Sequence, residues 1–273
     1  YIKILMTFLT KIGVMQGRLS DNNMKSLSVY PKYPVKEFDT AAELKLNHIE
    51  FITKESSSFQ HNNFIWNDKK INALNKLYKS KGLKNISFID NRSIKKNFNT
   101  LINYYKKLIV QLSKAKFKIF IIPLFKKSEL KNKNLINFSK SLDIISNYCE
   151  KRKITFLIES NIDFKSFIKL KKIMKSKIGI TYDTGNKFLN NDKEYLKDII
   201  LFKDNLKHVH LKDRDSNGKN VIFGKGNVNF VKIFKNLKLI NYKGNFTIES
   251  TRQKNAKSTL IKNFMHIKSC LKN

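Results

Sequence analysis

The chain has 273 residues, 41% of them apolar, and only three prolines, a composition that excludes a disordered or fibrous protein. Its 55 basic and 21 acidic side chains give a net charge of +34. Only five of the basic residues are arginines and the other 50 are lysines spread along the whole chain. Base-edge and bidentate phosphate contacts favour arginine, so this pattern indicates solvated lysines rather than a dedicated nucleic-acid surface.

The cysteines and the apolar runs bear on compartment and membrane association. Cys149 and Cys270 are far apart and lack C-x-x-C spacing, so we expect free thiols in a cytoplasmic protein. Lys3 and Lys11 interrupt the apolar N-terminal stretch, which has no small-residue cleavage site, so no signal peptide is expected. Met6 is a candidate initiator. No apolar run reaches the roughly 18 residues that a membrane-spanning helix needs.

Apolar, β-branched runs recur along the chain and predict eight strands. They begin near Ile12, His48, Asn85, Lys118, Ile154, Ile178, Lys207 and Asn245. Helical patterns, with apolar residues three and four apart, lie between or after them: AAELKLN, KINALNKLYKSKG, FNTLINYYKKLIVQLSKAK, LINFSKSLDIISNYCEKR, FKSFIKLKKIMKSK, DKEYLKDIILFKDN, VNFVKIFKNLKLI and STLIKNFMHIKSCLKN.

This alternation predicts the α/β class and a single (β/α)8 TIM barrel over residues 1–273, with the first strand beginning near Ile12. A doubly wound open sheet is the structural alternative. It usually needs fewer strands, and the first strand here lacks the G-x-G-x-x-G turn that a dinucleotide-binding sheet carries.

The last four predicted strands each end near a side chain that can bind a metal: Glu159 in ITFLIES, Asp183 in TYDTGN, His210 in HVHLKDR and Glu249 in NFTIES. A buried charge is costly unless it is paired or binds a metal. In this barrel the chemistry lies at the C-terminal ends of the strands. Three carboxylates and one imidazole suit Mn²⁺, Mg²⁺ or Co²⁺, with Zn²⁺ as a further option. We therefore expect one shared metal site.

The remaining histidines are predicted to be structural. His208 lies two residues before His210 and faces the same side of the strand, so we expect a deeper, hydrogen-bonded residue. His48, His61 and His266 have no partner pattern and are expected to be ordinary structural or surface residues.

Four arginines lie near predicted strand ends: Arg18, Arg92, Arg214 and Arg252. A planar guanidinium there would hold a carboxylate, a phosphate or polyol oxygens. The glycine-rich segment FGKGNVNF lacks the Lys-Ser/Thr of a phosphate-binding loop, and it is predicted to be the turn that leaves strand seven.

Seven segments occur in order across almost the whole chain: GVMQGRLS, HIEFI, LIESN, TYDTGN, HVHLKDR, FGKGNVNF and FTIES. Together they resemble the xylose-isomerase-like TIM barrels, specifically the sugar phosphate isomerase/epimerase group. In the ketose 3-epimerases of that family a Glu, Asp, His, Glu quartet binds a divalent metal, and both glutamates act as acid and base. The resemblance implies Glu159, Asp183, His210 and Glu249 as ligands, with Glu159 and Glu249 as catalytic residues.

The resemblance also bears on substrate binding. Those epimerases commonly have a substrate-binding His three residues after the Asp, a position that is Asn186 here. Glu50 and Asp213 fit polar positions seen near the pocket in the family. The predicted substrate-binding residues are therefore Arg18, Glu50, Asn186, Lys212, Asp213, Arg214 and Arg252.

The implied reaction is proton abstraction next to a carbonyl through an enediolate, with a metal that chelates the carbonyl and an adjacent hydroxyl. The same parts serve epimerisation and aldose–ketose isomerisation. The expected partner is a small sugar or sugar phosphate, with no specific nucleic acid and no membrane, and a homo-oligomer is compatible with the resemblance.

Three alternatives stay open. A metal-dependent dehydratase of cyclic polyols, of the inosose type, would use the same metal and bases. An apurinic-site endonuclease of the same superfamily would need a three-zinc cluster with many histidines, whereas this chain has five. A non-catalytic binding protein would not need two carboxylates at one metal.

Overall fold

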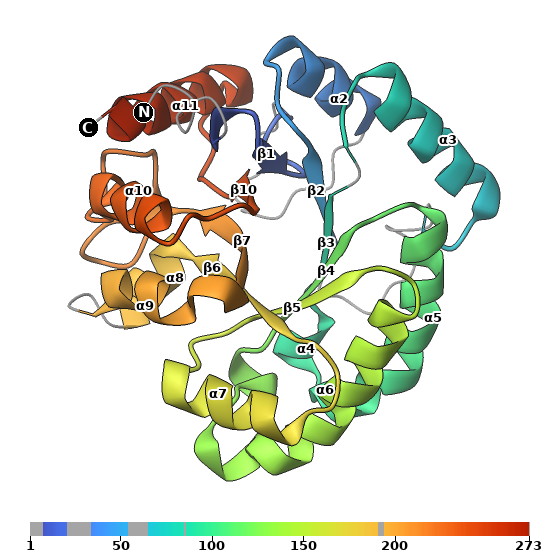
Figure 1. The fold of residues 1–273 in the computed structure, drawn as a ribbon. Helices are drawn as coiled ribbons and strands as arrows, with labels where there is room; N and C mark the ends of the chain where they lie inside the picture. Colours follow the sequence, from blue (N-terminus) through green and yellow to red (C-terminus); the bar gives the residue numbers. More distant parts are fainter. Residues whose placement is uncertain (1–7, 21–33, 54–64, 85, 191–193, 273) are drawn as a thin grey trace. The chain divides into compact units, whose positions relative to one another are not determined.

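The computed structural model describes residues 8–20, 34–53, 65–84, 86–190 and 194–272. Within them, eight strands pair in the order β1-β10-β7-β6-β5-β4-β3-β2 and close into a parallel barrel (Figure 1). The strands are β1 (Ile12–Met15), β2 (Ile49–Thr53), β3 (Ser87–Asp90), β4 (Ile119–Pro123), β5 (Thr155–Glu159), β6 (Gly179–Asp183), β7 (Leu206–Leu211) and β10 (Asn245–Ile248). The predicted (β/α)8 barrel is confirmed.

The predicted strand starts agree with the structure to within a residue or so. The exception is Asn85, which lies outside the described residues; the strand that follows it begins at Ser87. Residues 1–7, including Met6, also lie outside them.

By their contacts, the residues group into two compact units, Glu50–Thr181 and a unit made of Tyr1–Ile49 with Tyr182–Asn273. A single domain over residues 1–273 stays a prediction.

In the unit Glu50–Thr181 the helices are α3 (Asp68–Ser80), α4 (Arg92–Lys95), α5 (Ile102–Lys114), α6 (Leu135–Glu150) and α7 (Phe164–Ile173), with 3-10 turns η2 (Phe98–Leu101), η3 (Lys126–Ser128) and η4 (Asn132–Asn134). Helix α5 buries Tyr105, Leu108, Ile109 and Leu112, the spacing of one apolar face, and it packs against α6. Full burial of such a side chain contributes roughly 1.5–3 kcal/mol to folding. Burial of these faces, rather than helix propensity, therefore stabilises the helices.

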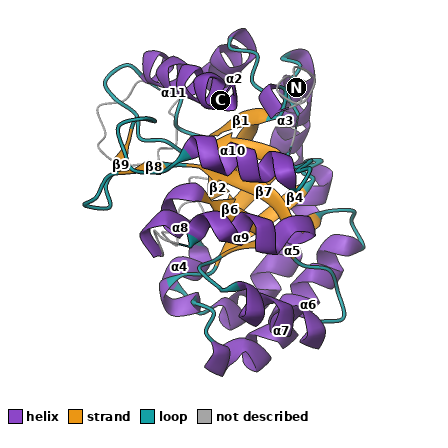
Figure 2. Ribbon diagram, turned by 60° about the vertical axis from the view of Figure 1, so that its left-hand side comes forward, coloured by secondary structure: helices purple, strands orange, loops and turns teal. Residues whose placement is uncertain are grey.

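The other unit contains α2 (Pro34–Glu43), α8 (Thr184–Asn190), α9 (Tyr195–Phe202), η5 (Lys203–Asn205), α10 (Phe230–Leu239) and α11 (Ala256–Lys272). Helix α10 contacts both α9 and α11. A short antiparallel hairpin of β8 (Asp213–Arg214) and β9 (Asn220–Val221) follows β7 and extends beyond the helices in Figure 2.

Three local features depart from the sequence expectations. The predicted helical segment AAELKLN is only half helical, because α2 ends at Glu43 and the chain turns through Lys45, whose φ is +54°. The hairpin β8–β9 and the short helix α8 were not predicted. The segment FGKGNVNF accordingly does not leave strand seven directly but connects β9 to α10.

Two further expectations concern apolar segments and thiols. Among the described residues, every helix is too short or too polar to cross a bilayer. Cys149 and Cys270 are buried and unbridged, as predicted for free thiols.

Candidate active site and metal centre

Asp183, His210 and Glu249 are carried by neighbouring strands of one unit. Asp183 is the last residue of β6, His210 is the residue before the end of β7, and Glu249 directly follows β10. The backbone N–H of Glu249 donates to the carbonyl of Leu211 at 2.9 Å, which continues the ladder between β10 and β7. Asp183 and His210 are buried, and the Glu249 side chain is 15% exposed. The structure therefore brings three of the four predicted metal ligands together within this unit.

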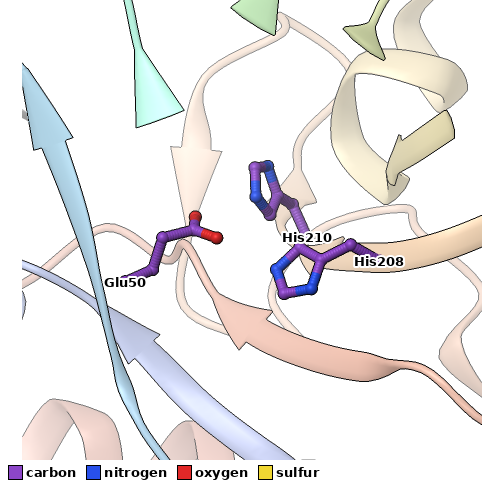
Figure 3. A group of neighbouring side chains, drawn as sticks. All are labelled: Glu50, His208 and His210. Carbon is purple, nitrogen blue, oxygen red and sulfur yellow. The ribbon is translucent and has the colours of Figure 1, made fainter. Parts of the chain in front are cut away.

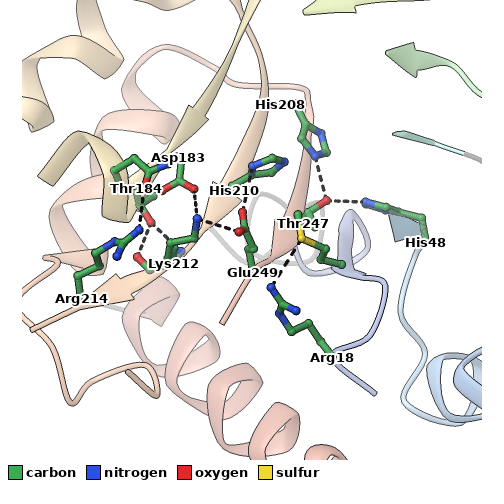
Figure 4. A network of polar contacts seen from close by, with 12 residues as sticks. Arg18, His48, Asp183, Thr184, His208, His210, Lys212, Arg214, Thr247 and Glu249 are labelled. Carbon is green, nitrogen blue, oxygen red and sulfur yellow. Dashed lines mark hydrogen bonds and ion pairs between the residues drawn. The ribbon is translucent and has the colours of Figure 1, made fainter. Parts of the chain in front are cut away.

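The ammonium group of Lys212 bridges the two carboxylates (Figure 4). Its Nζ lies 2.6 Å from Asp183 Oδ2 and 2.8 Å from Glu249 Oε1. His210 Nδ1 lies 3.4 Å from Glu249 Oε2. Burial opposes ionisation of Asp183, but the Lys212 ammonium and His210 outweigh it and lower the pKa of Asp183. The space between these carboxylates thus favours a cation.

Asp183 uses its two oxygens for different partners. Oδ1 accepts a hydrogen bond of 2.7 Å from the backbone N–H of Asn186 at the start of α8, and Oδ2 accepts from Lys212. Thr184 fixes the Lys212 backbone, because its hydroxyl donates to the Lys212 carbonyl and accepts from the Lys212 N–H. A Cβ at Gly185 would lie 2.9 Å from Lys212 Cγ, so glycine leaves room for the lysine side chain.

The predicted substrate-binding residues Asn186 and Arg214 lie side by side. Arg214 donates from Nη2 to Asn186 Oδ1 at 2.9 Å and from Nη1 to the carbonyl of Gly218 at 2.7 Å. Arg214 thereby joins the hairpin β8–β9 to helix α8, and its guanidinium holds the Asn186 amide in one orientation.

Asp213, also predicted to bind substrate, holds a loop in the structure. Its carboxylate accepts hydrogen bonds from the backbone N–H groups of Gly224, Gly226 and Val228 at 2.9, 3.1 and 3.2 Å. A Cβ at Gly226 would lie 2.2 Å from Asp213 Oδ1, so glycine is required for this close approach. These contacts explain why the segment FGKGNVNF is rich in glycine, so a phosphate-binding role is not needed to explain it. A role of Asp213 in substrate binding stays a prediction.

A layer of hydrogen-bonded imidazoles lies beneath His210. The His208 and His210 rings are nearly perpendicular, with centroids 5.3 Å apart (Figure 3). The Thr247 hydroxyl lies 2.9 Å from His208 Nε2 and 3.0 Å from His48 Nε2, and all three side chains are buried. His208 is thus the deeper, hydrogen-bonded residue that the sequence predicted, and His48 is a structural residue. Gly13 leaves space for the His48 ring.

Arg18 and Arg252 follow β1 and β10 in the same unit. Arg18 is buried, and Arg252 donates from Nη1 to the carbonyls of Gly17 and Ser20 at 3.1 and 3.0 Å.

His266 contacts Phe230 and Cys270 at the surface helices and is structural, as predicted. His61 lies outside the described residues.

The other predicted site residues belong to the unit Glu50–Thr181. Glu159 is the last residue of β5, is 5% exposed and pairs in register with Thr181 of β6, two residues before Asp183. Glu50 is buried on β2. Arg92 lies over the Tyr104 ring and near Asp90, so this arginine has protein partners. The metal and substrate roles of Glu159 and Glu50 stay predictions.

Comparison with known proteins identifies the family. The sequence model of the xylose isomerase-like TIM barrel family matches residues 38–270. The chain belongs to this family. Two uncharacterized proteins of Methanocaldococcus jannaschii are 26% and 30% identical to it over 149 and 117 residues. The chain spans about half the length of these relatives, 51% and 45%.

Several solved structures share the barrel over nearly its whole length. D-psicose 3-epimerase from Clostridium cellulolyticum H10, crystallised with D-tagatose, is 14% identical, with a TM-score of 0.71 over 96% of this chain and 97% of that one. D-allulose 3-epimerase from Methylomonas sp. is 15% identical, with a TM-score of 0.72 over 96% and 98%. A sugar phosphate isomerase/epimerase from Parabacteroides distasonis is 13% identical, with a TM-score of 0.69 over 95% and 94%. At these identities the similarity shows the shared xylose isomerase-like fold.

Sequence reasoning missed the residues that orient the site in this xylose isomerase-like chain. Thr184 and Thr247 hold Lys212 and two imidazoles, and Glu37 holds the loop around Arg18. Thr247 lies in β10, where threonine is common for reasons of propensity, and Thr184 is an ordinary polar residue at the start of α8, so neither threonine stands out. Glu37 lies in the first turn of α2, where an acidic residue is ordinary.

Proposed function

We propose that this chain is a divalent-metal-dependent isomerase or epimerase of a sugar or sugar phosphate, acting by proton abstraction next to a carbonyl. One observation carries the proposal: Asp183 and Glu249 share a buried cation, the Lys212 ammonium, beside His210. Membership of the xylose isomerase-like family supports it. Among the relatives of known fold are proteins named as sugar 3-epimerases.

The proposed metal ligands are Glu159, Asp183, His210 and Glu249. Three of them form the carboxylate and imidazole group described above, a donor set that suits Mn²⁺, Mg²⁺ or Co²⁺ and that Zn²⁺ also accepts. The fit is supported by Lys212, because a position that already stabilises one buried cation has the charge that a metal requires. When bound, the metal would supply polarisation of the substrate carbonyl.

Glu159 and Glu249 are the proposed acid and base. Strands β6 and β7 separate β5 from β10 in the barrel order, so we infer that the two carboxylates approach a substrate from different sides. A base must come within hydrogen-bonding reach of the proton that it takes. Removal and return of a proton on opposite faces gives epimerisation, and return at the neighbouring carbon gives isomerisation through the enediolate.

The remaining proposed contacts orient the substrate. Arg18, Glu50, Asn186, Lys212, Asp213, Arg214 and Arg252 supply charges and amide groups for its oxygens. Asn186 replaces the His that ketose 3-epimerases commonly have, and its amide is held by Arg214. We infer that the amide offers a hydrogen bond without a titratable proton, so proton transfer belongs to the two glutamates.

The proposal is tested by solvent exchange with a panel of ketoses and ketose phosphates in D₂O, with saturating Mn²⁺. An active substrate should take up deuterium at the carbon beside the carbonyl, nearly completely in the product of an epimerase. Glu159→Gln and Glu249→Gln should each lower turnover by about a hundredfold or more, because the amide keeps the shape but removes the basicity.

Glu194→Gln is the matched control, because this exposed glutamate forms an ion pair with Lys197, three residues further along the chain. It should leave turnover unchanged. If Glu249→Gln retains full activity with metal bound, the two-carboxylate mechanism is wrong.

A further inference from the structure

Arg18 is a buried guanidinium with unused hydrogen-bond donors. It is 3% exposed. Its Nη2 lies 3.8 Å from Met15 Sδ, a weak acceptor, whereas Nε and Nη1 have no hydrogen-bond partner among the described residues. Nε and Nη1 carry three of the five N–H donors of a guanidinium. A buried charged group without acceptors costs free energy, and a bound acceptor would offset that cost.

The backbone on both sides of Arg18 is held in place. The Glu37 carboxylate accepts from the N–H of Gly17 at 3.0 Å, the N–H of Leu19 at 3.2 Å and the hydroxyl of Ser20 at 2.8 Å. Gly17 has a φ of +84°, which favours glycine, so the turn before Arg18 is a fixed conformation.

Arg252 holds the same loop from the other side. Its Nη1 donates to the carbonyls of Gly17 and Ser20. The side chains of Glu37 and Arg252 thus both form hydrogen bonds with the backbone around Arg18. The loop is organised to present one side chain, which is how a specific recognition residue is positioned.

The charged neighbours of Arg18 are the carboxylates of Glu249 and Glu37 and the guanidinium of Arg252. Burial lowers the pKa of Arg18; Glu249 opposes this effect and Arg252 adds to it. Glu249 is engaged with Lys212 and Glu37 with the loop backbone. In Figure 4 the dashed contact of the Arg18 guanidinium runs to the Met15 sulfur, and the carboxylate of Glu249, the proposed catalytic base, is near enough to raise the pKa of Arg18. A ligand bound by Arg18 would therefore lie beside the proposed reaction centre.

We propose that Arg18 is the anchor of an oxyanion subsite that binds an anionic group of the substrate, a phosphate or a carboxylate. Bidentate donors on a planar fork suit both groups. This inference deepens the proposed function and rests on it for the substrate class: sugars that carry an acidic group, rather than neutral sugars. The buried arginine is thus a binding group for the ligand and not a contributor to the fold.

The first test measures binding without catalysis. Inorganic phosphate is titrated calorimetrically into metal-free full-length protein at low ionic strength. Arg18→Gln and Arg18→Met should weaken phosphate binding by about tenfold or more, as expected for the loss of charge-assisted hydrogen bonds. Arg152→Gln is the control, because it removes one positive charge at a half-buried arginine that lies over Tyr148, and its phosphate affinity should equal that of the wild type. Equal phosphate affinities of the wild type and Arg18→Gln would overturn the subsite.

Thermal unfolding separates a binding role from a structural one. If Arg18 has no partner in the folded chain, Arg18→Met should keep or raise Tm, because a methionine fills the space without a buried charge. A fall of Tm by ten degrees or so would assign Arg18 to the fold instead. Arg18→Lys, which retains a charge, should recover part of the phosphate binding.

Kinetics complete the test with two pairs of substrates. One pair is a ketose and its phosphate, and the other is the same ketose and the corresponding sugar acid. Arg18→Gln should lower the ratio of kcat/KM for the anionic member to that for the neutral one by about thirtyfold, and the preferred pair identifies phosphate or carboxylate. An unchanged ratio would overturn the subsite even with exchange activity present. Arg18-dependent phosphate binding without exchange on any sugar would instead refute the proposed function and leave the subsite standing.

Discussion

Lys212 places a fixed positive charge between two of the proposed metal ligands. Its Nζ makes hydrogen bonds of 2.6 and 2.8 Å to Asp183 and Glu249, and each charge-assisted bond of this kind is worth about 1.5–3 kcal/mol. A metal at this position would have to displace the ammonium group. Lys212 would then stabilise the metal-free protein and lower its affinity for metal.

We therefore expect the metal-free protein to bind about one Mn²⁺ per chain, and Lys212→Met to bind it about tenfold more tightly. Asp183→Asn and His210→Ala should weaken binding strongly, because each removes a ligand. Isothermal titration calorimetry and the rise of Tm with Mn²⁺ measure these affinities.

The control for Lys212→Met is Lys187→Met. Lys187 is also buried, at 4% exposed, but it pairs with Asp198 at 2.9 Å. Its replacement should leave Mn²⁺ affinity unchanged. Parental affinity in both Asp183→Asn and His210→Ala would refute the metal assignment.

The site shows which residue-level features a sequence can reveal. That Asp183, His210 and Glu249 lie close together was predictable, because a charged or imidazole side chain near the end of a buried strand is conspicuous. Lys212 was predicted among the substrate-binding residues, but its position between the two carboxylates was not. A lysine side chain has four rotatable bonds, so spacing along the chain does not fix the place of its ammonium group.

At the scale of elements, Asp213 organises the connection from β9 to α10. One carboxylate accepts three backbone N–H groups from residues 224–228. Burial raises the pKa of Asp213, and these N–H groups oppose the rise without cancelling it. A single buried side chain therefore accepts three of the hydrogen bonds that hold this loop.

Asp213→Ala should lower the free energy of unfolding by about 3 kcal/mol, because it removes the acceptor of three backbone N–H groups, of which the one at Val228 is buried. Asp213→Asn, which keeps one acceptor oxygen, should lose less. Urea denaturation followed by circular dichroism measures both. Asp215→Ala is the control, since Asp215 accepts from Asn217 and Lys219 in an exposed turn and should cost less than about 1 kcal/mol. If the free energy of unfolding falls equally in Asp213→Ala and Asp215→Ala, the special role of Asp213 in this loop is wrong.

The elements that could be predicted are those in which the hydrophobic pattern repeats over many residues. Helices α5, α6, α10 and α11 begin and end close to the expected positions because each buries one apolar face. Helix α8, at seven residues, is too short for such a pattern and begins directly after Asp183, whose carboxylate accepts from its backbone. The β8–β9 hairpin pairs only two residues per strand, so tertiary contacts determine it rather than propensity.

At the scale of the whole molecule, the net charge of +34 has to be reconciled with the proposed sugar-binding site. Such a charge attracts nucleic acid through its phosphates, independently of sequence. An apurinic-site endonuclease would also need a cluster of zinc ligands. Of the four histidines in the described part of the chain, His48 and His208 bind Thr247 and His266 contacts Cys270. His210 lies beside the Glu249 carboxylate.

We expect duplex DNA to bind weakly and without sequence preference, with an affinity that falls at least about tenfold between about 50 mM and about 200 mM salt. The physical reason is that lysines on solvated faces contribute counterion release but few directed contacts to bases. Fluorescence anisotropy with a labelled duplex measures the salt dependence, and a duplex with one abasic site serves for cleavage. No cleavage should occur with Zn²⁺, Mn²⁺ or Mg²⁺. Efficient cleavage at the abasic site would refute the proposed isomerase or epimerase function and identify a nuclease instead.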